Sequence, residues 1–131
     1  MPILGVGVDV LNIHRIIALV KRRSATRIAA RILSDEELTV WQPLSTKNAA
    51  LRDRFLAVRF SVKEAAYKGL YPHARPTWKE LTFLASGGSR KPTLTYHPSA
   101  LATPIGTLHT SISHDGDYVF STVVVEGPLL R

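Results

Sequence analysis

Hydrophobic positions along the first part of this chain follow two different periods. Ile3 to Val10 is apolar and rich in β-branched residues, which predicts a buried strand. From residue 13 to residue 20 apolar side chains recur every three or four positions, which is typical of a helix, and Asn12 precedes them as a candidate N-cap. We therefore expect a strand that leads directly into a helix, with an interruption of the helix near Ser24.

Two further helices are predicted before residue 71. Ser34 followed by Glu37 is a capping-box pattern, so a short helix should begin at Asp35 and run toward Pro43. The longest helical pattern runs from about Asn48 to Leu70, and apolar side chains occupy most of its circumference. A helix of this kind is normally covered on both faces, which in so small a protein indicates a wrapped sheet or a second subunit.

Alternating patterns in the second half of the chain predict antiparallel strands. Leu81 to Ser86 and Thr93 to Tyr96 should pair across a turn at Gly87 to Arg90, and a second hairpin should turn at Asp115-Gly116. The strands of this second hairpin should span Thr107 to Ser113 and Tyr118 to Val125. The predicted class is α+β, an antiparallel sheet wrapped around one long helix, and 131 residues suit a single domain, 1–131.

Charge, hydropathy and cysteine content limit the partners and the cellular location that we expect for this protein. Lys and Arg number 17 against 10 Asp and Glu, and this net charge of +7 favours nucleic acid, phosphorylated cofactors or acidic proteins. No apolar run approaches the roughly 20 residues of a membrane span, and the first residues lack the charged region of a secretory signal. Cysteine is absent, which excludes disulfides and thiolate catalysis. We expect a soluble cytoplasmic protein without a membrane partner, with the mitochondrial matrix as the alternative.

One carboxylate among lysines is the strongest chemical signal in the chain. Phe60 to Lys68 reads FSVKEAAYK, in which Glu64 lies directly after Lys63 and one helical turn before Lys68. A magnesium-dependent phosphate site requires this combination, because the acid binds the hard cation and the ammonium groups bind the anion. The alternative is an ordinary solvated helix face with an i, i+4 ion pair.

A second acid, Asp9, lies at the end of the first predicted strand. An acid there is unfavourable unless it is capped, paired or bound to a metal, and capping of the following helix is the simpler explanation. Together with Glu64 it would supply two oxygen ligands. Since Mg²⁺ typically takes one or two carboxylates plus phosphate oxygens and water, two acids suffice.

Other polar patterns also bear on phosphate chemistry. His109, Ser111 and Ser113 share one face of a predicted strand, where Ser113 is expected to face solvent and His109 with Ser111 could bind a diphosphate or also face solvent. The glycines of Gly5 to Asp9 lie inside a strand and lack the third glycine of a dinucleotide fingerprint. P-loop, zinc-protease and serine-hydrolase motifs do not occur in the sequence.

Five segments in one order carry a family resemblance. They are Gly7-Val8-Asp9, Arg54 to Arg59, Phe60 to Lys68, Arg90-Lys91-Pro92 and His109 to His114. With these segments the chain resembles the holo-acyl-carrier-protein synthase type of 4′-phosphopantetheinyl transferase over nearly its whole length. The match to the family's helix motif at Phe60 to Lys68 is complete and specific.

This resemblance implies a transferase fold and a reaction. The enzyme would move 4′-phosphopantetheine from coenzyme A to a serine of an apo acyl carrier protein and release adenosine 3′,5′-bisphosphate. Asp9 and Glu64 would bind Mg²⁺, and Lys68 would complete the catalytic set by stabilising charge on the diphosphate. The implied coenzyme A ligands are Arg59, Lys63, Lys68, Lys91, Pro92, His109 and Ser111.

The resemblance also implies partners. Carrier proteins are acidic, so the basic helical surface would dock them, with apolar anchors between the arginines. This docking set is Arg15, Leu19, Arg22, Arg27, Ile28 and Arg31. Relatives of this short type are trimers with sites between subunits, which agrees with a long helix that is apolar nearly all round.

Some alternatives remain open from the sequence. A small basic nucleic-acid-binding module fits the charge, but residues 10–34 lack the aromatic side chains that such modules use for stacking, so we expect no nucleic acid partner. A catalytically idle scaffold subunit with the same fold is a third possibility. The acceptor of the serine proton could be Glu64, a metal-bound water or Asp35. The sequence does not identify the carrier protein or its pathway.

Overall fold

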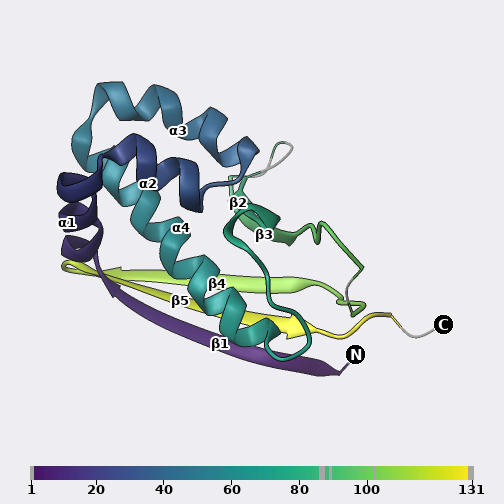
Figure 1. The fold of residues 1–131 in the computed structure, drawn as a ribbon. Coiled ribbons are helices and arrows are strands. Elements are labelled where there is room, and N and C mark those ends of the chain that lie inside the picture. The colour runs from purple at the N-terminus through teal and green to yellow at the C-terminus, as the bar shows by residue number, and fades with distance from the viewer. Residues whose placement is uncertain (1, 86–87, 89, 102, 130–131) are drawn as a thin grey trace.

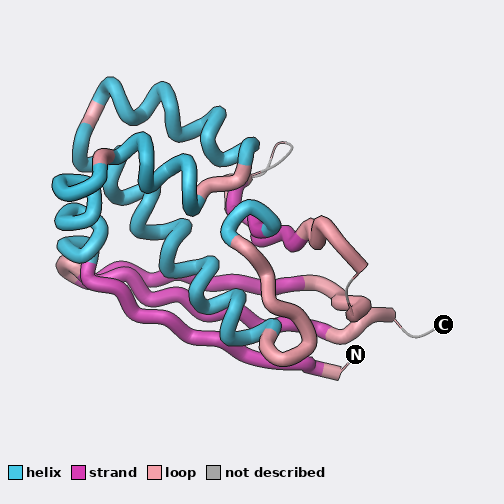
Figure 2. The backbone as a smooth tube through the Cα atoms, viewed as in Figure 1, coloured by secondary structure: helices cyan, strands magenta, loops and turns pink. Residues whose placement is uncertain are grey.

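The computed structural model describes residues 2–85, 88, 90–101 and 103–129, and in it the helices lie together on one side of a strongly twisted sheet (Figure 1, Figure 2). In chain order the elements are β1 (Ile3–Asn12), α1 (Ile13–Arg23), α2 (Ala25–Ile32), α3 (Asp35–Lys47), α4 (Ala49–Leu70), the 3₁₀ helix η1 (Trp78–Glu80), β2 (Leu81–Leu84), β3 (Thr93–Tyr96), β4 (Leu108–Asp115) and β5 (Tyr118–Glu126).

The junctions of the first helices follow from their capping residues. Asn12 Oδ1 accepts a hydrogen bond from the backbone N–H of His14 at 3.0 Å, so α1 begins where the sequence predicted. Ser24 separates α1 from α2 with a φ of 88°, a value that residues other than glycine rarely adopt. Its backbone N–H bonds Val20 O at 2.9 Å and its Oγ accepts from Arg27 N at 3.3 Å. The predicted interruption near Ser24 is confirmed.

Helix α3 begins with the predicted capping box and runs further than predicted. Ser34 N donates to Glu37 Oε1 at 2.9 Å, and Glu37 N donates to Ser34 Oγ at 3.4 Å. The helix continues through Pro43 to Lys47. A proline lacks one backbone N–H, but its fixed φ is itself helical, so later hydrogen bonds, such as Asn48 N to Leu44 O at 3.3 Å, carry the helix on.

The α+β class is confirmed, and within the described residues the strands form two antiparallel sheets instead of one. The larger has the order β1-β5-β4, and the smaller pairs β2 with β3. The β4–β5 hairpin turns at Gly116, whose φ of 57° suits glycine. Residues 87 and 89 of the predicted β2–β3 turn lie outside the described residues.

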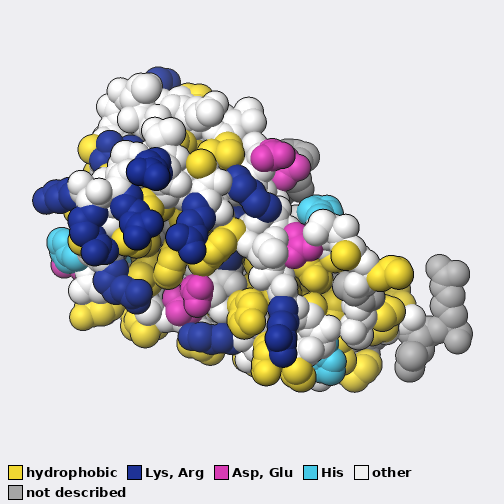
Figure 3. Space-filling view, in the orientation of Figure 1, with side chains coloured by type: hydrophobic (Ala, Val, Ile, Leu, Met, Phe, Trp, Pro, Cys, Tyr) yellow, Lys and Arg dark blue, Asp and Glu magenta, His cyan; other side chains and the backbone are white. Residues whose placement is uncertain are grey.

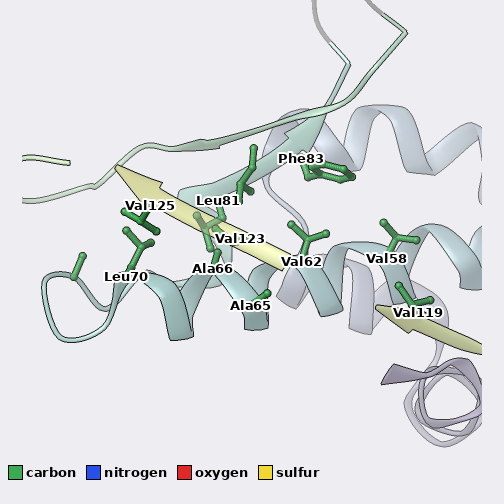
Figure 4. Packing of buried hydrophobic residues seen from close by; sticks show 12 residues of the cluster. Val58, Val62, Ala65, Ala66, Leu70, Leu81, Phe83, Val119, Val123 and Val125 are labelled. Carbon is green, nitrogen blue, oxygen red and sulfur yellow. The ribbon is translucent and has the colours of Figure 1, made fainter. Parts of the chain in front are cut away.

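Helix α4 is buried on two sides by different parts of the chain, which explains its apolar circumference. One side packs Val62, Ala66 and Leu70 against Leu81, Val123 and other residues of the sheets (Figure 4). The other side packs Leu56 and neighbouring apolar residues against α1, α2 and α3. The sheets and the remaining helices thus supply the two-sided cover that the sequence predicted.

Small residues bring α4 unusually close to β1. A Cβ on Gly7 would lie against Ala65 O, and one on Gly5 against Gly69 O, both well inside the 3.0 Å below which real Cβ contacts are essentially absent. These glycines do not form a phosphate-binding fingerprint. They allow β1 to pack closely against α4. Asp9 is two residues beyond Gly7 on the same strand, so this approach also carries Asp9 toward α4.

The face of the larger sheet that turns away from the helices carries exposed apolar side chains. Val6, Val8 and Val10 of β1 are 56%, 55% and 52% exposed, and Tyr118 and Phe120 of β5 are exposed beside them. Such a contiguous apolar surface is uncommon on a monomer. Among the described helices none has the length and hydropathy needed to cross a membrane.

Candidate active site

Asp9, Glu64 and Lys68 meet where β1 crosses α4. Lys68 Nζ donates to Val8 O at 3.0 Å and lies 3.4 Å from Asp9 Oδ1. Burial raises the pKa of Glu64, the negative charge of Asp9 raises it further, and the cations Lys68 and Arg15 partly offset this rise. The structure thus brings together the two acids and the lysine that the sequence predicted.

The residues of this site fit a divalent cation. Asp9 Oδ2 is buried and has no hydrogen-bond partner among the described residues, although a carboxylate oxygen in such a position normally has one. Burial and the charge of Asp9 raise the pKa of a second carboxylate, Glu64, so both groups would gain from a shared positive charge. Within the described residues there is no group of three or more His, Cys, Asp and Glu side chains arranged for a metal. Two carboxylates suit Mg²⁺, which keeps other positions for phosphate and water.

A cavity of about 360 Å³ adjoins Glu64, and most of its lining residues were not predicted from the sequence. It is lined by Lys63, Glu64, Tyr67, Pro76, Thr77, Trp78 and Leu81. Tyr67 follows Glu64 by three positions on α4, so helical spacing would have placed the two on one side. Trp78 comes from the loop after α4, and its place depends on tertiary packing that no local pattern reports.

A second cavity, also of about 360 Å³, gathers four of the predicted coenzyme A ligands. Arg59, Lys91, Pro92 and Ser111 line it, together with Val58, Phe83, Thr110, Ile112 and His114. Burial and nearby Arg54 lower the pKa of His114, so Arg54 adds positive charge beside the cavity. We refer to this as the β4 cavity.

Arg59 is held firmly at the wall of the β4 cavity. Its guanidinium donates twice to Phe83 O, at 3.1 and 2.9 Å, and lies 3.7 Å from the centre of the Phe55 ring. Burial lowers the pKa of Arg59 to about 10, against the opposing effect of Glu37, so it remains a cation at neutral pH.

The structure does not place Lys63 among the phosphate ligands. Its side chain is buried, and Nζ donates to Ile32 O at 2.8 Å, Glu37 Oε1 at 2.6 Å and Trp78 O at 3.0 Å. These bonds use the three donors of an ammonium group. The prediction that Lys63 binds coenzyme A phosphates is therefore corrected: its donors point into the protein interior, which the motif alone did not reveal.

His109 also lies away from the β4 cavity. It is on the exposed face of β4, opposite Val124 of β5, with Nε2 3.2 Å from Glu126 Oε1. Residues 109, 111 and 113 alternate outward as the sequence predicted. Asp9 is on β1 and the β4 cavity is on β4, so the two parts of the predicted site lie at opposite edges of the larger sheet.

The basic surface forms a groove over α1 and α2. Lysine and arginine side chains gather on that side of the molecule with apolar side chains between them (Figure 3). A cavity of about 430 Å³ there is lined by Leu19, Arg23, Arg27, Ile28, Arg31, Ile32, Phe60 and Trp78, and we call it the docking groove. Four of the predicted docking residues line it, whereas Arg22 does not and Arg15 is close enough to Glu64 to lower its pKa.

The fold and these sites correspond to one known family. Its family model, described as the 4′-phosphopantetheinyl transferase superfamily, matches residues 5–123. The chain belongs to the 4′-phosphopantetheinyl transferase superfamily.

Particular relatives have a more specific name. The chain is 40% identical over 132 residues to a holo-(acyl-carrier-protein) synthase of Edwardsiella ictaluri, a match that covers 97% of this chain and 100% of the relative. It is similar to the crystal structure of the Neisseria meningitidis synthase, with a TM-score of 0.77, 29% identity and coverage of 95% and 99%. The Bacillus anthracis synthase, solved in complex with CoA (3′,5′-ADP), gives a TM-score of 0.73 at 26% identity, with coverage of 96% and 98%.

Proposed function

We propose that this protein is a holo-(acyl-carrier-protein) synthase, which transfers 4′-phosphopantetheine from coenzyme A to a serine of an apo acyl carrier protein. The observation that carries the proposal is the carboxylate of Asp9, whose Oδ2 is buried without a hydrogen-bond partner among the described residues while its charge acts on Glu64 and its Oδ1 lies beside Lys68, in a chain of this family. Relatives bear this name, and the Bacillus anthracis relative binds coenzyme A. The relatives named here are bacterial, which favours the cytoplasm over the mitochondrial matrix.

Each residue of the site has a task in this reaction. Asp9 and Glu64 would hold Mg²⁺, which when bound neutralises charge on the diphosphate. Lys68 donates to a diphosphate oxygen and stabilises the negative charge that develops there. The serine hydroxyl oxygen attacks the phosphorus attached to pantetheine, and the bond from that phosphorus to the adenosine bisphosphate breaks. Glu64 is the proposed acceptor of the serine proton.

The β4 cavity is proposed to bind the phosphates on the adenosine side of coenzyme A. Arg59, Lys91 and nearby Arg54 supply positive charge there. His109 points to the outer face of the sheet and would reach the ligand from a neighbouring subunit.

A direct assay tests the proposed function. The protein is incubated with coenzyme A, Mg²⁺ and a panel of apo carrier proteins, and carrier mass is measured. Addition of one phosphopantetheine to a carrier, dependent on Mg²⁺, supports the transferase. If no carrier in the panel gains mass and the protein instead binds RNA in a salt-sensitive manner, the basic-module alternative is favoured.

The docking groove makes a separate prediction. Reversing Arg27 and Arg31 to glutamate should raise the KM for the carrier about 10- to 100-fold, because both arginines line the groove that would meet an acidic surface. The KM for coenzyme A should stay within about twofold. Lys47→Glu is the matched control, since it reverses an exposed charge at the end of α3. The measurement is steady-state kinetics with each substrate varied in turn. A carrier KM of the double variant equal to that of the control would show that the groove does not bind the carrier.

We further propose that the active site forms between copies of this chain in a homotrimer. Within one copy, Asp9 on β1 and the β4 cavity lie at opposite edges of the larger sheet. In the proposed trimer, the β1 edge of one copy would lie next to the β4 edge of its neighbour. The exposed apolar face formed by Val6, Val8, Val10 and Phe120 would be buried in that assembly.

Charges on this face should dissociate the assembly. Val10 and Phe120 are register partners on β1 and β5, and changing both to lysine should convert a trimer to monomers at micromolar concentration and reduce transfer at least about tenfold. Sedimentation velocity gives the mass, and Val40→Lys, at an exposed valine of α3, is the control. A wild type that sediments as a monomer with full activity would exclude a shared site.

A further inference from the structure

Lys63 joins several elements of the protein through one buried ammonium group. It is 2% exposed, and its hydrogen bonds reach the last residue of α2 at Ile32 O, the first turn of α3 at Glu37 and the 3₁₀ helix η1 at Trp78 O. The lysine itself is on α4, directly before Glu64. Four elements therefore meet at a single side chain.

Glu37 fixes the other end of this cluster. It is 0% exposed, its Oε1 also accepts from Ser34 N at 2.9 Å, and its Oε2 accepts from Phe83 N at 2.8 Å. A buried ion pair with its remaining oxygen positions satisfied contributes little net stability compared with apolar residues of the same size. Such a pair can instead specify a single arrangement of the elements it joins, which is a role to be tested for each protein.

The elements that Lys63 joins line two sites, the docking groove and the cavity beside Glu64. Ile32 lines the docking groove, whose arginines are on α1 and α2. Trp78 lines both the docking groove and the cavity beside Glu64, and its ring stacks on Phe60 with ring centres 5.3 Å apart. Trp78 is therefore part of the wall between the place where a carrier would dock and the place where its serine would react.

We propose that Lys63 is a positioning residue for the carrier protein, which holds the docking groove in register with the Glu64 site by binding Ile32 O and Trp78 O. The inference rests on the proposed transferase function. Its physical basis is distance: a carrier must contact α1 and α2 and present its serine to Glu64 at the same time, so a displacement between the two prevents it from making both sets of contacts and weakens its binding. Coenzyme A, bound by Lys68 and the β4 cavity, does not need Ile32 and Trp78 in register, although Glu37 lies 4.0 Å from Arg59 of that cavity.

A double variant separates positioning from simple stability. Lys63→Met with Glu37→Gln removes both buried charges together and leaves the two carbonyl groups without the ammonium donor. The matched control is Glu37→Gln alone, which keeps the Lys63 bonds to both carbonyls. Because Glu37→Gln is present in both and lies beside Arg59, the double variant is compared with the control: we expect its carrier KM to be about tenfold higher and its coenzyme A KM to stay within about twofold of the control.

A second measurement guards against a folding defect. Arg27→Glu is combined with the double variant, and carrier KM is measured for wild type, each change and the combination at a temperature where circular dichroism shows all to be folded. If Lys63 positions the groove that contains Arg27, the two effects should be clearly less than additive. Lys63→Arg provides a further variant that retains the charge opposite Glu37, and its carrier KM should rise at least about threefold.

The outcomes decide between the explanations. Unchanged carrier KM in the double variant, or equal losses for both substrates, would overturn the positioning role. If neither the double variant nor Lys63→Arg folds, Lys63 serves stability alone and the proposal fails. Absence of transfer by the wild type, by contrast, refutes the transferase function itself, so the two failures are distinguishable.

Discussion

Replacing Glu64 with glutamine is expected to lower the rate of phosphopantetheine transfer about 10³-fold and to abolish its response to Mg²⁺. Glutamine has nearly the same shape but provides a neutral amide in place of a carboxylate, so it would neither hold the cation with Asp9 nor accept the serine proton. The measurement is the initial rate of carrier modification over a range of Mg²⁺ concentrations. Retained turnover with an unchanged Mg²⁺ dependence would show that Glu64 has no part in the chemistry.

The same substitution should raise the thermal midpoint measured without Mg²⁺. The pKa of Glu64 is raised in the folded protein, so its ionised form is less favourable there than in the unfolded chain. Folding stability therefore falls as pH rises from the ordinary glutamate pKa through the raised value, and above that range glutamine removes the penalty. Differential scanning calorimetry at pH 7.5 and again at pH 4 provides the check, because the gain should shrink at the lower pH.

Gly7→Ala is expected to destabilise the protein by about 3 kcal/mol or more. The new Cβ would collide with Ala65 O, a backbone atom that cannot turn aside, so β1 must move away from α4. Activity should fall with stability even in the folded fraction, since Asp9 would move away from Glu64. Urea unfolding measures the first effect and transfer kinetics the second.

Gly88→Ala is the control for the glycine prediction. A Cβ on Gly88 would meet nothing within 4 Å among the described residues, so its effect should stay within about 0.5 kcal/mol. Equal stability of the Gly7 and Gly88 variants would mean that β1 and α4 do not pack as closely as the structure shows.

The elements of this fold could be predicted largely because their signals are local. Asn12 and the Ser34–Glu37 box are capping patterns read within four residues, and Asp115-Gly116 is a turn pattern. The division of the strands into two sheets could not be predicted in this way. It depends on how β2 and β4 lie around α4, which is a matter of packing between distant segments.

The site could be predicted less completely, for a related reason. Motif spacing identified Asp9, Glu64 and Lys68, and the structure brings them together. The family resemblance also implied that Lys63 binds phosphate, because the sequence of the motif does not show whether this lysine faces solvent or Glu37. The close approach of β1 to α4 could not be predicted, because Gly7 is required by its contact with Ala65, which is distant in the sequence.

The strand order of the larger sheet also determines when that sheet can form during synthesis. β1 pairs with β5, which leaves the ribosome after every other described element. Until then the edge carrying Asp9 has no hydrogen-bonded neighbour strand, and closing so long a loop is slow relative to local helix formation. A nascent chain would therefore form its helices first and complete the larger sheet only when β5 arrives to cover the inner edge of β1.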